Sequence, residues 1–228
     1  MAIGRLFVAN RGEIALRVVR AAQALNLETV VGVSDADRAS AAARLADRSL
    51  VLGPGPAAKS YLDARLIVQA AKASGCDALH PGYGFLSERA ELAQLCEDHG
   101  IAFVGPKPDM IDALGDKLRA REMAQAAGVP LVPGSGEIAT AADARVVADE
   151  IGYPVLLKAA AGGGGRGMVI VGGPDEIEAG FNRASAEALA AFNDGTLFME
   201  RFVPEARHVE VQLVGDGQGG VIHFGERD

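Results

Sequence analysis

The first 105 residues alternate short apolar segments with helical patterns, and this alternation constrains the fold more than any other feature. The β-branched run at residues 29–33 has the composition of a strand buried on both faces, as in parallel sheets. The other strands predicted here are residues 6–9, 49–52, 78–80 and 101–104, and the predicted helices are 13–24, 39–46, 63–73 and 89–99. Repeated strand–helix units predict a parallel sheet with helices on both faces, which binds ligands at the carboxyl ends of its strands.

The pattern changes after residues 105–108. Helices are predicted at residues 108–114, 117–127, 141–151 (with Thr140 as N-cap) and 175–191, and strands at 154–158, 168–171, 196–201 and 208–214. This order predicts an α+β unit with helices on one face of its sheet. We place the boundary between Gly105 and Lys117. Residues 221–228 read as a strand entering a loop without a capping element, so we expect an incomplete second domain.

Charge and composition exclude several classes of protein. The net charge of −8 argues against a general binder of nucleic acid or anionic membranes, although it leaves room for a local phosphate site. No apolar run approaches the roughly 20 residues that span a bilayer. The start of the sequence lacks a signal-peptide layout, so we expect a cytoplasmic protein. Cys76 and Cys96 are predicted to be buried thiols, since no cysteine or histidine spacing indicates a metal site.

The strongest local signal is a run of four glycines at residues 162–165, followed by Arg166 and Gly167, between two predicted strands. Glycine lets successive backbone N–H groups turn toward one anion, and Lys158 on the preceding strand adds a positive charge. The alternative is a loop without function, but ordering such a run is costly unless a ligand offsets the entropy. Residues 10–13 and 53–60 fail as a dinucleotide fingerprint and as a P-loop, respectively, because required glycines are missing.

Several longer segments resemble the biotin carboxylases, a family of ATP-grasp ligases. Residues 8–15 (VANRGEIA) look like the N-terminal signature of that family, and residues 80–88 (HPGYGFLSE) look like a second signature. Residues 115–117, the glycine run, and residues 198–203 and 207–210 match in order and approximate spacing. Two residues depart from the family pattern: Arg89, where the family usually has asparagine, and Ala160, where it often has serine or threonine. We expect both effects to be mild, with the lost hydroxyl at Ala160 weakening at most one contact.

The resemblance implies a fold class, α/β, with an N-terminal parallel Rossmann-like (pre-ATP-grasp) domain at residues 1–110 and an incomplete α+β ATP-grasp domain at 117–228. A lid would span about residues 131–203. The nucleotide-binding residues that it implies are Lys117 and Lys158 at the phosphates, Gly163, Gly164, Gly165, Gly167 and Met168 in the flap, Glu200, Arg201, Phe202 and Val203 at the adenine, and His208 near the ribose. Plainer alternatives stay open: Lys117 as a solvated helix residue and His208 as an ordinary strand residue. Residues 80–84 follow a short strand and are either a loop that lines the cleft near the reacting groups or a rigid turn.

By the same resemblance, the intact enzyme uses MgATP (or the Mn²⁺ complex) and bicarbonate to form carboxyphosphate, and then carboxylates biotin on a carrier. The metal ligands and catalytic residues of the family follow beyond Asp228, so none is assigned in this chain. The implied partners are a biotin carboxyl carrier protein or domain, a carboxyltransferase component and a second copy in a homodimer, as in acetyl-CoA carboxylase of fatty acid synthesis. A carbamoyl-phosphate-synthetase-like ligase and a truncated, non-catalytic nucleotide-binding module are the alternatives. We also expect the glycine flap to be mobile without ligand.

Overall fold

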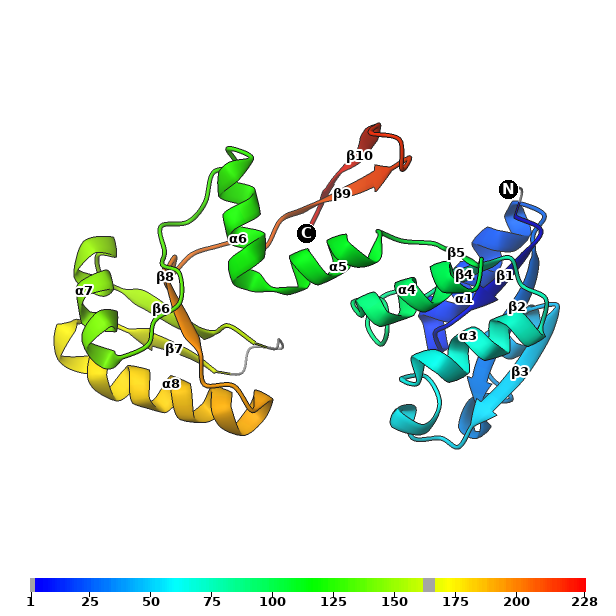
Figure 1. Ribbon diagram of the computed structural model, residues 1–228, viewed down its shortest axis with the longest axis horizontal. Helices are drawn as coiled ribbons and strands as arrows, with labels where there is room; N and C mark the ends of the chain where they lie inside the picture. The colour runs from blue at the N-terminus through cyan, green and yellow to red at the C-terminus, as the bar shows by residue number, and fades with distance from the viewer. Residues whose placement is uncertain (1–2, 162–166) are drawn as a thin grey trace. The chain divides into compact units, whose positions relative to one another are not determined.

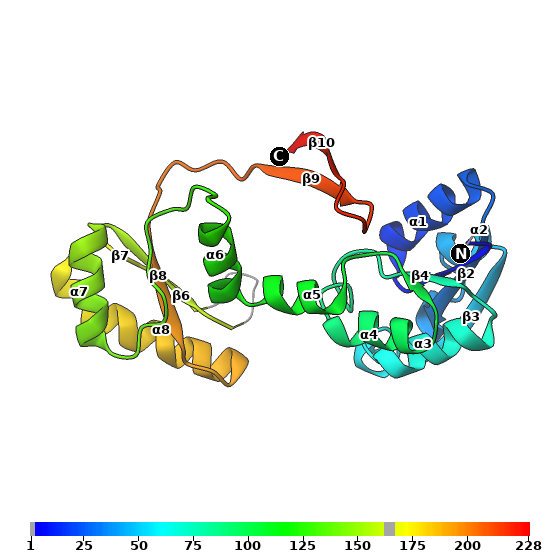
Figure 2. The ribbon, with the colours of Figure 1, turned by 45° about the horizontal axis from the view of Figure 1, so that its top comes forward.

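The computed structural model describes residues 3–161 and 167–228. The chain divides into two compact units, Met1–Met123 and Ala124–Asp228, which are described separately. Figure 1 and Figure 2 show both units in two views, with the first unit coloured from blue to green. The predicted domain ranges, 1–110 and 117–228 with a lid at about 131–203, stay predictions.

The first unit contains a five-stranded sheet in which every neighbouring pair is parallel, in the order β3-β2-β1-β4-β5. Its strands are β1 (Arg5–Val8), β2 (Glu28–Ser34), β3 (Arg48–Gly53), β4 (Ala78–His80) and β5 (Ala102–Phe103). The central strand is β1, where Phe7 pairs with Val30 on one side and Leu79 on the other. The parallel α/β sheet predicted from the alternation is therefore confirmed.

Helices follow the strands in turn. They are α1 (Gly12–Ala24), α2 (Ala41–Leu45), α3 (Ala64–Ala73), α4 (Ala90–Asp98), α5 (Pro108–Gly115) and α6 (Lys117–Ala126), with 3-10 turns η1 (Asp35–Asp37) and η2 (Ala57–Lys59). The predicted helix at 39–46 is shorter than expected, because Ser40 caps it: its hydroxyl accepts a hydrogen bond from the Ala43 N–H at 3.2 Å. The predicted strand at 101–104 is reduced to two residues.

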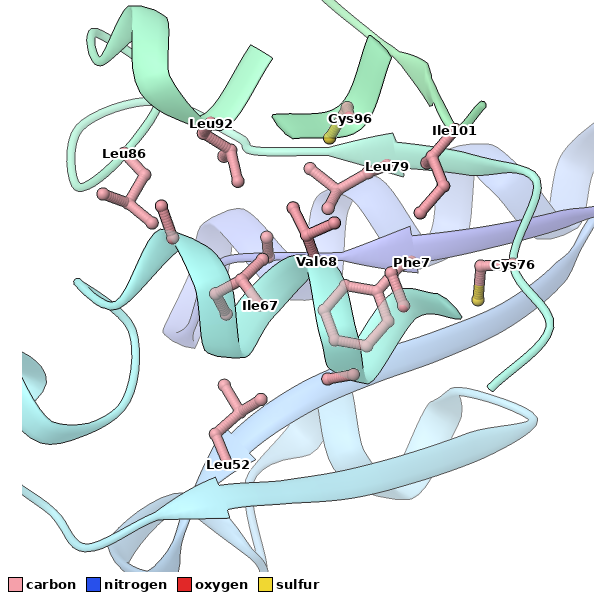
Figure 3. Close-up of a cluster of buried hydrophobic side chains, with 14 of the residues drawn as sticks. Phe7, Leu52, Ile67, Val68, Cys76, Leu79, Leu86, Leu92, Cys96 and Ile101 are labelled. Atoms are coloured by element: carbon pink, nitrogen blue, oxygen red, sulfur yellow. The ribbon is translucent and has the colours of Figure 1, made fainter. Parts of the chain in front are cut away.

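Both faces of this sheet are buried, as the sequence predicted. Leu6 and Val8 point to one face, where they pack with residues of α1 and α2, while Phe7 points to the other. Figure 3 shows that second cluster, in which Phe7 and Leu79 meet Ile67 and Val68 of α3. Cys76 and Cys96 are buried there and unpaired, which confirms their prediction as buried thiols. Burial raises the pKa of the Cys96 thiol to about 12.

The second unit contains an antiparallel sheet in the order β7-β6-β8. Its elements are α7 (Ala141–Ile151), β6 (Val155–Ala159), β7 (Met168–Val171), η3 (Pro174–Glu176), α8 (Ile177–Phe192) and β8 (Leu197–Arg201). The predicted N-cap is confirmed, because the Thr140 hydroxyl accepts a hydrogen bond from the Asp143 N–H at 3.1 Å. The last helix begins two residues later than predicted, since Pro174–Glu176 form a 3-10 turn.

One face of this second sheet is buried, and the other, called the open face below, is only partly covered: Met168 and Ile170 are exposed there, whereas Phe198 is buried. Every second side chain of β6 packs in a cluster with α7 and α8, namely Val155, Leu157 and Ala159. The side chains between them, Leu156 and Lys158, are only half-buried. Gly180 lets α8 pack closely on the sheet: a Cβ there would lie 2.7 Å from the Val171 side chain. Helices on one face of an antiparallel sheet confirm the α+β prediction.

The last two strands, β9 (Glu210–Gly215) and β10 (Val221–Arg227), form an antiparallel hairpin whose register shifts between His223 and Glu226. The prediction that a strand starts at His208 is wrong, because the strand begins at Glu210 and His208 lies in the preceding connection. Across residues 3–161 and 167–228, no helix combines the length and apolar character needed to cross a bilayer.

Candidate functional site

The open face of the second sheet carries a cation and a carboxylate side by side. Lys158 comes from β6 and Glu200 from β8, and their side chains point to the face that the helices leave uncovered. The Lys158 Nζ lies 2.6 Å from Glu200 Oε2, and the two side chains are 27% and 22% exposed. The antiparallel register places them diagonally, since Lys158 pairs with Phe198 and Leu156 with Glu200.

The Lys158 ammonium has a second neighbour in the Phe198 ring, whose centroid is 5.6 Å from Nζ. A cation over an aromatic face is stabilised by the ring quadrupole. An ammonium has three N–H donors, and Glu200 accepts one of them. Lys158 is thus held at a fixed point of the sheet while it keeps the capacity to donate to an anionic group.

In the sequence, the glycine-rich segment follows β6, which carries Lys158, and precedes β7. Gly163, Gly164 and Gly165 lie outside the described residues, so their predicted contact with phosphates is untested. Gly167 is described: its φ is +65°, and a Cβ there would lie 3.0 Å from Ala159 Cβ, which favours glycine at this position. Met168 begins β7 as the register partner of Lys158, on the same open face of the sheet.

Residues 200–203 run from the end of β8 into the following connection, and their backbone N–H groups differ in use. The Arg201 N–H donates to the Pro133 carbonyl at 2.8 Å, and the Phe202 N–H donates to the Pro154 carbonyl at 3.0 Å. Among the residues with described positions, no acceptor contacts the Val203 N–H, and Val203 is half-exposed. The role of Val203 at a nucleotide stays a prediction.

Lys117 and His208 lie on other segments than Lys158 and Glu200. Lys117 is the first residue of α6, behind Asp116, whose carboxylate caps the helix by accepting from the Leu118 and Arg119 N–H groups at 2.9 and 3.0 Å. His208 is exposed, and its Nε2 lies 3.6 Å from Glu210 Oε2. The roles of both residues at a nucleotide stay predictions.

A second polar cluster lies at the carboxyl edge of the parallel sheet in the first unit. Asp37 accepts two hydrogen bonds from the Arg11 guanidinium, each at 2.8 Å, one from the Tyr61 hydroxyl at 2.7 Å and one from the Ser34 hydroxyl at 3.0 Å. The hydrogen bonds from Arg11 in particular lower the pKa of Asp37 to about 2.

Sequence reasoning included Arg11 in a motif but missed Asp37 and Tyr61. The signal that would have found Asp37 is its place directly after β2, where parallel sheets collect ligand and loop contacts. Tyr61 carries no such signal, because it precedes α3 and reaches Asp37 only through the fold. Burial raises the pKa of Tyr61. Burial also lowers the pKa of His80, the first residue of the motif at residues 80–88.

Family comparisons cover almost the whole chain. Residues 2–111 match the family described as biotin carboxylase, N-terminal domain, and residues 116–228 match carbamoyl-phosphate synthase L chain, ATP binding domain. The biotin carboxylase of Nostoc sp. is 47% identical over 229 residues, which cover all of this chain and 51% of that protein. Mouse mitochondrial pyruvate carboxylase is 47% identical over 228 residues, 99% of this chain and 19% of that protein.

Solved structures agree with these relatives. The crystal structure of a biotin carboxylase–β,γ-ATP complex from Campylobacter jejuni matches with a TM-score of 0.93 at 44% identity, covering 99% of this chain and 51% of that one. The biotin carboxylase domain dimer of Hydrogenobacter thermophilus 2-oxoglutarate carboxylase, in complex with MgADP, ADP and bicarbonate, matches with a TM-score of 0.91 at 44% identity, covering 99% and 50%.

The parallel α/β unit followed by an antiparallel unit with a glycine-rich connection defines the class as ATP-grasp. Within that class, the chain belongs to the biotin carboxylase family and carries its N-terminal and ATP-binding domains. It spans about half the length of the Nostoc biotin carboxylase (51%) and a smaller part of the mouse pyruvate carboxylase (19%).

Proposed function

We propose that this chain forms the nucleotide-binding part of an ATP-dependent biotin carboxylase, which uses MgATP and bicarbonate to carboxylate biotin on a carrier through carboxyphosphate. The observation that carries the proposal is the Lys158–Glu200 pair on the open sheet face, on the strand that the glycine-rich sequence follows. The Campylobacter and Hydrogenobacter structures, described as nucleotide complexes, support it.

Each proposed ligand contact follows from the chemistry of its residue. The Lys158 ammonium and the amides of Gly163, Gly164, Gly165 and Gly167 suit phosphate oxygens, with Lys117 as a second cation. Glu200 and the Val203 N–H suit the hydrogen-bonding edge of an adenine, and Phe202 holds this segment to the sheet through Pro154. Met168 and Arg201 flank the site, and His208 is assigned to the ribose side.

A divalent ion, Mg²⁺ or Mn²⁺, neutralises the charge that develops during phosphoryl transfer. In the described part of the chain, no cluster of acidic, histidine or cysteine side chains fits such an ion. The proposal therefore assigns the metal ligands, and the groups that hold bicarbonate and biotin, to sequence that follows Asp228 in the family.

The carrier, the carboxyltransferase component and the homodimer belong to the same proposal. The Hydrogenobacter structure is described as a dimer, which supports the last of these. Acetyl-CoA carboxylase is one system that such a chain would serve, while relatives also include pyruvate carboxylases and methylcrotonoyl-CoA carboxylase subunits. A cytoplasmic location is likewise a proposal, since some relatives are named mitochondrial or chloroplastic.

The test is the Lys158→Ala substitution in the complete protein. A charge-assisted hydrogen bond contributes about 1.5–3 kcal/mol, so we expect kcat/KM for ATP to fall by at least about tenfold. Lys72→Ala on the exposed surface of α3 is the matched control and should retain the parental kinetics. Unchanged kinetics in Lys158→Ala would contradict the site.

A second candidate, a carbamoyl-phosphate-synthetase-like ligase, is favoured only by the name of the family that residues 116–228 match. The two candidates differ in the cosubstrate that stimulates ATP cleavage. Stimulation by biotin supports the proposed function, whereas stimulation by ammonia supports the alternative.

A further inference from the structure

The loop that follows β4, residues 81–85, has a backbone that an unsupported chain rarely adopts. Gly82 and Gly84 have φ values of +68° and +66°, and Phe85 has φ +49° although it is not glycine. A bulky residue in the left-handed region costs on the order of 1–3 kcal/mol and persists only where its surroundings fix it. The contacts around this loop therefore show what holds it.

One set of contacts comes from Asn10, a fully buried residue at the end of β1. Its Nδ2 donates to the Pro81 carbonyl at 2.7 Å and to the Tyr83 carbonyl at 3.0 Å. A Cβ on Gly82 would lie 2.7 Å from the same Nδ2, so the amide is packed directly against the loop backbone. Both N–H donors of Asn10 are thus used to fix one turn.

The other set of contacts holds the far end of the loop. The Phe85 ring stacks on the Tyr61 ring with centroids 5.5 Å apart and planes 5° from parallel. The buried Tyr61 hydroxyl donates to Asp37 at 2.7 Å and accepts from the Ser34 N–H at 2.8 Å. Asp37 in turn binds Arg11, the residue after Asn10, so both ends of the loop are tied to the end of β1.

What these contacts fix in space is Tyr83, which is 70% exposed between two left-handed glycines. Its carbonyl is held by Asn10 while its ring is presented at the carboxyl edge of the parallel sheet, where ligands of open α/β sheets bind. An ordinary surface turn does not need a buried amide, a buried tyrosine and a carboxylate that accepts four hydrogen bonds, contributed by three separate segments.

We propose that Asn10, Asp37 and Tyr61 are positioning residues that hold the loop at residues 81–85 in its reactive shape during the carboxylation reaction. This inference rests on the proposed function. The residues proposed above to bind ATP, Lys158 and Glu200, are not members of this network, so we expect the network to serve turnover and not the capture of ATP. Removing hydrogen bonds from this network lowers kcat and leaves KM for ATP unchanged.

The experiment compares Asp37→Asn with Asp35→Asn in the complete protein. Both substitutions remove one negative charge from the same 3-10 turn, but Asp35 is exposed and its ion pair, with Arg38 at 2.7 Å, is on the surface. We expect Asp37→Asn to lower kcat of biotin-dependent ATP cleavage by about tenfold or more, with KM for ATP within about twofold. Asp35→Asn should match the parent in both constants.

A ¹⁹F NMR signal from fluorotyrosine at position 83 reports on the loop without any need for activity. We expect this resonance to broaden or shift in Asp37→Asn and to stay unchanged in Asp35→Asn. If Asp37→Asn fails to fold, Tyr61→Phe replaces it, because this change removes only the hydroxyl and keeps the ring that stacks on Phe85.

Three results would overturn the positioning role: a lowered kcat with an unchanged ¹⁹F signal, a changed signal with parental kcat, or equal losses in both aspartate variants. A raised KM for ATP with unchanged kcat would overturn it too. If the parental protein itself shows no biotin-dependent ATP cleavage, the proposed function fails, and the ¹⁹F signal still decides whether the network holds the loop.

Discussion

The two polar regions of this chain are built in different ways. At the carboxyl edge of the first sheet, Asn10, Asp37 and Tyr61 are largely buried, and each makes at least two hydrogen bonds. On the open face of the second sheet, Lys158 has one carboxylate and one ring as partners, and both charges face partly into solvent. In the first region the polar side chains hydrogen-bond to one another within the protein, whereas in the second Lys158 can still donate to a ligand.

The two regions differ in what their hydrogen bonds do for the protein. A buried, saturated network fixes geometry, because every broken bond leaves a polar group without water. A partly exposed cation beside a glycine-rich segment can exchange partners at low cost, which suits a site that takes up and releases an anion. Stability should therefore depend on the first region and ligand affinity on the second.

The largest stability effect is expected from Gly82→Ala. The positive φ and a Cβ placed 2.6 Å from Ile14 Cγ2 combine strain with a clash, for a loss of about 2–4 kcal/mol in the free energy of unfolding. Gly136→Ala in the second unit is the control, since no atom lies within 4 Å of the added Cβ. Urea unfolding measures the free energy of unfolding of both variants. Equal losses in the two would contradict a larger contribution of the first region to stability.

A smaller effect should separate the two carboxylates. Asp37→Asn removes the charge and replaces one of the two accepting oxygens of the buried network with an NH2 donor, so we expect a loss of about 1–3 kcal/mol. Glu200→Gln leaves an amide oxygen as acceptor on a partly exposed pair, so the loss should stay below about 1 kcal/mol. Chemical denaturation measures both values, and a larger loss in Glu200→Gln contradicts the assignment of stability to the first region.

The sequence predicted the strand–helix order of both units, because apolar periodicity and β-branched runs reflect local burial. It also singled out Lys158 and Glu200, which the antiparallel register then brought within 2.6 Å. It did not predict the Asp37–Tyr61 contact, which joins residues 24 apart in sequence through the packing of α3 on the sheet. Nor did it predict that the Phe202 N–H donates a hydrogen bond to the Pro154 carbonyl, because that bond depends on strand pairing.

The smallest expected effect is a pH dependence. The pKa of Asp37 is lowered to about 2, so its folded state favours the ionised carboxylate. The stability from this shift is fully present above the ordinary carboxyl pKa near 3.8 and is lost as the pH falls toward 2. The difference in unfolding free energy between the parent and Asp37→Asn should shrink over that window. A constant difference from pH 6 to pH 2 would show that the charge of Asp37 contributes nothing.

The role of Lys158 in binding ATP is measured by titration calorimetry of the complete protein with ATP. We expect saturable binding by the parent and an affinity at least about tenfold weaker for Lys158→Ala, while Asp37→Asn binds like the parent. Equal affinity of the parent and Lys158→Ala, or no uptake of ATP by the parent, would contradict this role.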